Sequence, residues 1–479
     1  MFNYKFYYDE TEHSRSLSCK TVVADEFYDG FVTAIVGWAS RDEMELERKY
    51  TAFEMKHRSP GASELKSTSL NKKQFKYGLG SLSKANVRMI GDFLALFDEY
   101  TLVYYSYSSK VEHLIYRLFP QHYEIPGINI DLLMYSLAKL VVQYRPEKVV
   151  EAFYGDPDHL LEAIRAFLLD RIERNEANIE LKRSEIEQCE LILTFMNTAT
   201  PLDNTEWEYR SPFKGFALYL SEHPSIDDYE LVIDQEEKTA EAAKELGFPS
   251  VRQADSVNCF GVRMADMLAG ILGKLLKSIR EELTYSSSKE ELDKKLFDER
   301  WFDIDDARLD LYKQLRRVLI QSDKCWYKAF GGSYSDDLIV LIALLNYFSN
   351  FESSGDLKEG LDNHPEAFNA CCCRNLQQHF EIVKFPAPWR VGAHNICSNL
   401  RPRLKVSDKS TVYNVIKVML AEDGAPMIVV RESDDVAYIL PDELIGWVEL
   451  LLDTGADNWL FPCDVRFQIV GGICRAEML

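Results

Sequence analysis

The chain has 479 residues, and at roughly 100 to 200 residues per domain this length predicts two to four domains. It is 46% hydrophobic and 12% aromatic, which suffices for globular cores. Its net charge of −22 excludes broad, nonspecific nucleic-acid binding, because such binding neutralises phosphates with Lys and Arg; any nucleic-acid contact is expected to be local.

No apolar run approaches the roughly 20 residues that span a bilayer, and the start MFNYKFYYDETEH does not resemble a signal peptide. We therefore expect a cytoplasmic protein with no membrane contact. The ten cysteines form no C-x-x-C pair and three are adjacent (371–373), which favours reduced thiols over a zinc site. The nine histidines show no ligand spacing, and no P-loop, G-x-G-x-x-G or G-x-S-x-G motif occurs.

The N-terminal pattern predicts two strands, at 3–11 and 31–40, followed by a charged, helix-compatible segment at 42–56. The residues HRSPG break this pattern at 57–61. A helix capped by Ser83 is expected to run to Glu99, and a strand at 101–108 follows.

Helical patterns at 111–119 and 131–144 lead into a long amphipathic stretch at 158–196. This stretch predicts a helical hairpin, inserted at about 127–200. Fewer than four clean heptads can be counted, so a solvated helical arm is favoured over a coiled-coil partner helix.

From Phe213 the chain alternates between short apolar and helical segments, as a mixed α/β sheet with packed helices requires. The expected order is strand, strand, helix, strand, helix, at 216–221, 229–235, 238–246, 249–256 and 260–276. The polar stretch SSSKEELDKK near residue 287 marks a boundary. Helices are expected at 305–320 and 335–348, and strand and helix signals resume after about 386.

Asp266 stands in the apolar helical run FGVRMADMLAGILGKLL, so its carboxylate needs a compensating partner. A divalent metal is one such partner, and Arg263, one helical turn earlier, is another. The small residues Ala265, Ala269 and Gly270 would let a second backbone approach Asp266 closely.

Asp9 and Asp234 each close an apolar strand, in KFYYD and ELVID. Strand ends on one sheet edge often form active sites, and the helix that carries Asp266 would pack on that sheet. The three carboxylates are therefore expected to converge, although either strand-end Asp alone is more typical of a turn or cap. Hard cations such as Mg²⁺ and Mn²⁺ prefer carboxylate oxygen.

Glu64 lies in an unusually basic window, since six basic residues and this one carboxylate occur between Lys56 and Lys76. Such a window suits a site that holds both a metal and a phosphate chain, and a solvated loop explains it equally well. Asp255, before the last helix of this region, is expected to be its N-cap, with metal binding as the alternative.

Five short motifs together resemble a known group: YYDET, SELKSTSL, LVIDQE, ADS and MADMLAG, spanning roughly 1–285. Their order looks like that of the bacterial domain-of-unknown-function family numbered thirty-eight hundred, which is similar to the ribonuclease H-like fold. The resemblance implies an acidic cluster of Asp9, Glu64, Asp234 and Asp266, with two-metal phosphodiester chemistry through Mg²⁺ or Mn²⁺. It also implies that Lys66 contacts substrate. Asp255 competes with Glu64 for the second position of the cluster.

The last part of the chain, at 405–448, looks like a single cystathionine-β-synthase-type repeat, a module that in pairs often binds adenine nucleotides. Only one copy is evident, so a plain accessory domain is favoured over a ligand sensor. The expected organisation is α/β: a ribonuclease H-like mixed sheet at 1–285 with its helical insertion, a helical region at 286–382 and a small α/β domain at 383–479.

The sequence thus predicts a metal-dependent nuclease or related phosphodiester-processing enzyme that acts on DNA or RNA, with phage defence or mobile elements as the analogous context. The basic segment, including Lys66, Lys72 and Lys73, would grip backbone phosphate. The alternative is an inactive ribonuclease H-like scaffold that binds nucleic acid or a protein partner, with the C-terminal domain used for sensing or homo-oligomerisation.

Overall fold

The structure of the protein is a computed structural model. It describes residues 2–11, 28–119, 130–155, 157–202, 207, 209–223, 225–285, 290–292, 295–321, 328–383, 404, 406, 411–420, 425–431, 436–453, 460–470 and 473–479.

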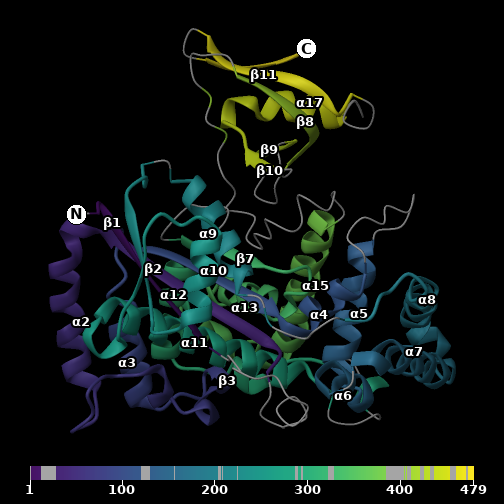
Figure 1. The fold of residues 1–479 in the computed structure, drawn as a ribbon, viewed down its shortest axis with the longest axis horizontal. Helices are drawn as coiled ribbons and strands as arrows, with labels where there is room; N and C mark the ends of the chain where they lie inside the picture. Colours follow the sequence, from purple (N-terminus) through teal and green to yellow (C-terminus); the bar gives the residue numbers. More distant parts are fainter. Residues whose placement is uncertain are drawn as a thin grey trace.

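A six-stranded mixed sheet organises the larger part of the chain (Figure 1). Three neighbouring strands pair antiparallel, with β2 between β1 and β4, while β5 and β6 continue the sheet beyond β1 in parallel. A short strand, β7, pairs parallel to β4 at the opposite edge. In spatial order the strands are β6 (Val251–Gln253), β5 (Tyr229–Ile233), β1 (Tyr4–Thr11), β2 (Gly30–Ala39), β4 (Leu102–Ser109) and β7 (Ala329–Gly331).

Both faces of this sheet are covered, which explains why the central strand β2, GFVTAIVGWA, is buried over almost its whole length. On one face lies the long helix α11 (Phe260–Leu283), with further helices packed around it. They are α2 (Glu43–His57), α3 (Lys84–Leu94), α12 (Asp306–Arg316) and α13 (Asp336–Phe348). On the other face lie α9 (Arg210–Ser221) and α10 (Glu237–Glu245).

The predicted helical insertion forms, together with the helix that precedes it, a bundle with its own core. Its helices are α4 (Lys110–Leu118), α5 (Ile130–Tyr144), α6 (Glu147–Gly155), α7 (Leu160–Glu176) and α8 (Ile179–Phe195). Helices α7 and α8 pack against each other, so the expected helical hairpin is confirmed; Figure 1 shows it at the right edge of the molecule. Residues 127–129, the expected start of the insertion, lie outside the described residues.

The helices after residue 290 share the core that lies under the sheet. They pack on α11 and α3, and this segment supplies the edge strand β7. The remaining helices are α14 (Ser354–Lys358) and α15 (His364–Val383), and α12 continues into a π-helical turn at Arg317–Gln321. Residues on both sides of position 285 therefore contribute to one hydrophobic core.

The C-terminal part, yellow in Figure 1, contains a second, antiparallel sheet of five strands. In spatial order they are β10 (Val436–Ile439), β9 (Pro426–Val430), β8 (Thr411–Leu420), β11 (Cys463–Val470) and β12 (Ile473–Met478), and helix α17 (Ile445–Asp453) packs on them. The mixed α/β class is confirmed. Parts of the segment that resembles a cystathionine-β-synthase repeat lie outside the described residues.

One predicted strand is wrong: residues 216–221 belong to helix α9. Phe213, Phe216 and Tyr219 are fully buried at intervals of three residues, which is helical spacing. The six-residue window FALYLS is too short to distinguish this period from strand alternation. The cap expected at Ser83 is confirmed, since its side chain accepts a hydrogen bond from the backbone N–H of Asn86. No helix in the described ranges is long and apolar enough to cross a membrane.

Candidate active site

Asp9 and Asp234 follow a pair of residues that are in register on two parallel strands. Tyr8 of β1 pairs with Ile233 of β5; Asp9 is the next residue of β1, and Asp234 directly follows the end of β5. Asp9 Oδ1 accepts a hydrogen bond of 2.7 Å from the backbone N–H of Glu10. Asp234 Oδ1 likewise accepts one of 2.9 Å from the N–H of Gln235. Each carboxylate is therefore oriented by the backbone N–H of the next residue, and within the described part of the chain its second oxygen accepts no hydrogen bond.

Asp266 reaches the same region from helix α11, which packs across β1 and β2. Both of its oxygens accept hydrogen bonds from Ser67, at 2.8 Å from the backbone N–H and 2.7 Å from the hydroxyl. The close approach expected beside Asp266 does occur, at Gly270: a Cβ atom there would lie 2.2 Å from Ser67 Cβ. A glycine at this position therefore lets the Ser67 segment reach Asp266.

Arg263, the alternative partner for Asp266, binds elsewhere. Its guanidinium forms an ion pair with Glu54 of helix α2, with Nε 3.2 Å from Oε1. It also donates to the backbone carbonyls of Ser256 and Val257, at 2.5 and 2.8 Å. The donors that compensate Asp266 come from Ser67 instead.

Glu64 lies in the extended segment that leads to Ser67. Its side chain is only 8% exposed, and Oε1 is 3.0 Å from the ammonium nitrogen of Lys66. Oε2 is buried and, among the described residues, accepts no hydrogen bond. The segment is held directly after Glu64, because the N–H of Leu65 donates to Glu54 at 2.8 Å and Ser67 binds Asp266. A buried carboxylate oxygen without a donor is unfavourable unless a cation or substrate group meets it.

Electrostatic coupling links these carboxylates. Burial raises the pKa of Asp9 well above its usual range, and the negative charges of Asp266, Glu10 and Asp234 raise it further. Burial also raises the pKa of Asp266, although the two Ser67 hydrogen bonds and the charges of Lys274 and Lys66 oppose the rise. Negative charge around Asp9 and Asp266 therefore exceeds the positive charge of the nearby lysines.

Lys66 is the basic residue most closely associated with the acidic group. Its bond to Glu64 raises the pKa of the ammonium group, with smaller contributions from the charges of Asp266 and Asp234. The side chain is 53% exposed. Lys66 therefore interacts electrostatically with three of the four predicted carboxylates, Glu64, Asp234 and Asp266, while its side chain still faces solvent.

The other predicted site residues lie farther out. Lys72 and Lys73 are exposed on a short 3₁₀ helix, Lys72–Phe75, beyond the Ser67 segment. Asp255 is exposed and caps the 3₁₀ helix Ser256–Asn258, accepting a 3.0 Å hydrogen bond from the N–H of Val257. Its capping role is thus observed, although the capped helix is this short one rather than α11.

Two residues of the site were missed by sequence reasoning. Ser67 directly follows Lys66 within the SELKS motif, so its position was a usable signal. Lys274 lowers the pKa of Asp266. It follows Asp266 and Gly270 at intervals of four residues, which places all three on one helical face. Its spacing was therefore a second signal.

Among the described residues, no three His, Cys, Asp or Glu side chains are already grouped closely enough to hold a metal ion. Comparison with protein-family models, with curated proteins and with solved structures gives no match to this chain.

Proposed function

We propose that this protein is a metal-dependent nuclease, or a related phosphodiester-processing enzyme, built on a ribonuclease H-like sheet. The strand arrangement supports this fold: a central first strand has an antiparallel pair of strands on one side and parallel strands on the other. The acidic residues at the end of β1, after β5 and on the covering helix support a site at one edge of that sheet.

The observation that carries the proposal is the excess of negative charge around Asp9, where burial, Asp266 and Asp234 all disfavour the ionised carboxyl group. A divalent cation would relieve this repulsion. The residues that would hold Mg²⁺ or Mn²⁺ are Asp9, Glu64, Asp234 and Asp266, all hard oxygen ligands. Bound metal would supply an activated water and stabilise the departing oxygen in phosphodiester cleavage.

Glu64 is a better candidate than Asp255 for completing this acidic cluster. Glu64 Oε2 is buried with no donor in the described part of the chain, whereas both oxygens of Asp255 face donors, Val257 N–H at 3.0 Å and the Asn258 amide at 3.5 Å. Lys66, beside Glu64, would contact a substrate phosphate, and the exposed Lys72 and Lys73 would extend that local contact along the backbone.

The test is cleavage of labelled single- and double-stranded DNA and RNA in the presence of Mn²⁺. We expect Asp9→Asn and Asp266→Asn to reduce the rate by about 100-fold or more, since a metal contributes several kcal/mol to the transition state. Glu64→Gln should behave like them, whereas Asp255→Asn should keep most of the activity. Asp362→Asn, at an exposed position, is the matched control.

Two outcomes would count against the enzyme. If the wild type cleaves none of the four polymers, or if the Asp9 and Asp266 variants cleave as fast as the wild type, the catalytic proposal fails. Retained binding of nucleic acid without cleavage would instead support an inactive scaffold.

A further inference from the structure

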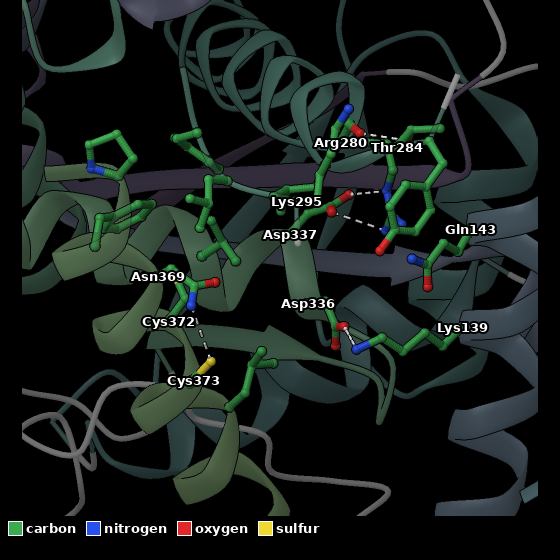
Figure 2. Close-up of a pocket in the computed structure, with 18 of the residues that line it drawn as sticks. Lys139, Gln143, Arg280, Thr284, Lys295, Asp336, Asp337, Asn369, Cys372 and Cys373 are labelled. Atoms are coloured by element: carbon green, nitrogen blue, oxygen red, sulfur yellow. Dashed lines mark hydrogen bonds and ion pairs between the residues drawn. The ribbon is translucent and has the colours of Figure 1, made fainter. Parts of the chain in front are cut away.

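A cavity of about 200 Å³ lies away from the carboxylate cluster, among helices α5, α11, α13 and α15. Figure 2 shows Lys139 and Gln143 on one side of it, Arg280 above, Asp336 and Asp337 in the middle, and Asn369 with Cys372 and Cys373 opposite. Asp9, Glu64, Asp234 and Asp266 do not line it.

The acidic groups of this cavity already have donors. Asp337 accepts hydrogen bonds from Arg280 Nε at 3.1 Å and from the Tyr28 hydroxyl at 2.8 Å, and its other oxygen forms an ion pair with Arg280 Nη2 at 3.0 Å. Asp336 receives the Tyr135 hydroxyl at 3.0 Å and the ammonium group of Lys139 at 2.8 Å. The cavity therefore offers few free acceptors to a ligand.

Among the described residues, in contrast, one N–H donor of Lys139 has no acceptor. Its ammonium group donates to Asp336 and, at 2.9 Å, to the Tyr135 hydroxyl, which uses two of its three N–H groups. Although burial opposes it, the charge of Asp336 raises the pKa of Lys139, so the ammonium group stays charged at neutral pH. The side chain is 39% exposed and lines the cavity. Lys139 can therefore donate to a ligand that enters.

The remaining wall is apolar and partly aromatic. The rings of Phe297 and Phe368 meet edge to face, with centroids 4.9 Å apart. Leu283, Val340 and Leu376 complete the wall. A cavity of about 150 Å³ with such a lining accommodates benzene, so this one has room for a single ring with one small substituent but not for a nucleotide.

The lining carries more positive than negative groups, which favours an anionic ligand. Lys139, Arg280 and Lys295 face two carboxylates, and the pairing of Lys295 with Glu290 at 3.3 Å is partly exposed and therefore weak. We propose that this cavity is a binding site for a small aromatic monoanion, a single ring that carries one carboxylate-type group. The anionic group accepts a hydrogen bond from Lys139, and the ring packs against Phe297 and Phe368.

Isothermal titration calorimetry with sodium benzoate tests the site, with benzamide as the neutral ligand of the same shape. Benzoate should bind with a Kd of about 1 mM or below, and benzamide about tenfold more weakly, because it cannot form the charge-assisted bond. Lys139→Gln should weaken benzoate about tenfold and leave benzamide nearly unchanged, whereas Lys139→Arg should restore much of the preference. Lys238→Gln, an exposed substitution on α10, is the matched control.

A second measurement locates the ligand, because Cys373 is exposed and lines the cavity while Cys463 lies on strand β11 of the other sheet. Benzoate should slow the alkylation of Cys373, followed by mass spectrometry, and leave that of Cys463 unchanged. The proposal is overturned if benzoate does not bind up to about 10 mM, if benzamide binds equally well, or if Cys373 gains no protection. Circular dichroism checks that each variant is folded. If Lys139→Gln is not folded, the two ligands on the wild type decide the outcome.

Discussion

Folding disfavours the ionised form of the Asp9 carboxyl group. Burial and the neighbouring carboxylates raise its pKa well above the usual range for an aspartate. The folded protein therefore holds this proton more tightly than the unfolded chain does, where the group titrates near pH 4. The same arrangement that would attract a cation makes the metal-free protein less stable at neutral pH.

A pH titration of stability checks this. Without divalent metal, the free energy of unfolding attributable to Asp9 should fall as the pH rises from about 4 through the raised folded-state pKa. Asp9→Asn removes the charge, so it should stabilise the metal-free protein at pH 7 and lose that advantage near pH 4. Urea unfolding across this pH range provides the measurement.

Adding a divalent metal should have the opposite effect on the stability of the wild type. Mn²⁺ should raise the midpoint of unfolding of the wild type and have much less effect on Asp9→Asn, because a cation that binds only the folded state stabilises it. The exposed Asp362→Asn should respond as the wild type does. Equal stabilities of the wild type and Asp9→Asn at every pH would contradict the assigned electrostatics.

At the scale of elements, two glycines allow helix α11 to pack closely against its neighbours. A Cβ atom on Gly261 would lie 2.3 Å from the ring of Tyr7 on β1, and one on Gly270 would collide with Ser67. These contacts hold the helix close to the sheet on one side and to the Ser67 segment on the other. The position of Asp266 therefore depends on residues without side chains.

Gly270→Ala should destabilise the protein by about 1–3 kcal/mol, because the added methyl group must displace Ser67 in a tightly packed region. Gly446→Ala in helix α17 is the matched control: nothing lies within 4 Å of its Cβ position, so it should be neutral or slightly stabilising. Urea unfolding distinguishes the two. Unchanged stability of Gly270→Ala would show that the Ser67 segment adapts without cost.

How well sequence patterns predicted these elements depended on the length of the pattern. Helix α11 was predictable because its apolar run is long and has helical spacing, and the shorter strands around Asp9 and Asp234 were predictable because polar residues mark where each ends. Helix α9 was wrongly predicted as a strand because the six residues FALYLS are too few to show the helical period. The pairing of Arg263 with Glu54 joins residues 209 positions apart, which local spacing cannot reveal.

At the scale of the whole molecule, the core under the sheet requires the chain well beyond residue 285. Trp301, Tyr312 and Leu341 are fully buried in it, and β7 adds a strand that the sequence did not indicate, since AFG is too short to show a period. The separation into units at 285 and 382 stays a prediction.

A fragment of residues 1–285 should consequently lack a cooperative unfolding transition, whereas 1–383 should keep one. Loss of the later helices exposes the apolar surface of α11 and α3 that they cover. Urea unfolding followed by circular dichroism compares the two fragments. A sharp transition in the shorter one would show that residues 1–285 are an independent folding unit.

The edges of the large sheet are its shortest strands. Strands β6 and β7 have three residues each, beside central strands of eight to ten. Such short edge strands present few unpaired backbone groups to another chain, which protects the sheet against aggregation by edge-to-edge pairing. In the C-terminal sheet the edge strand β12 has six residues, and Arg475 and Glu477 place charges along it. Short length protects the edges of the large sheet from aggregation, and charge protects the β12 edge of the other sheet.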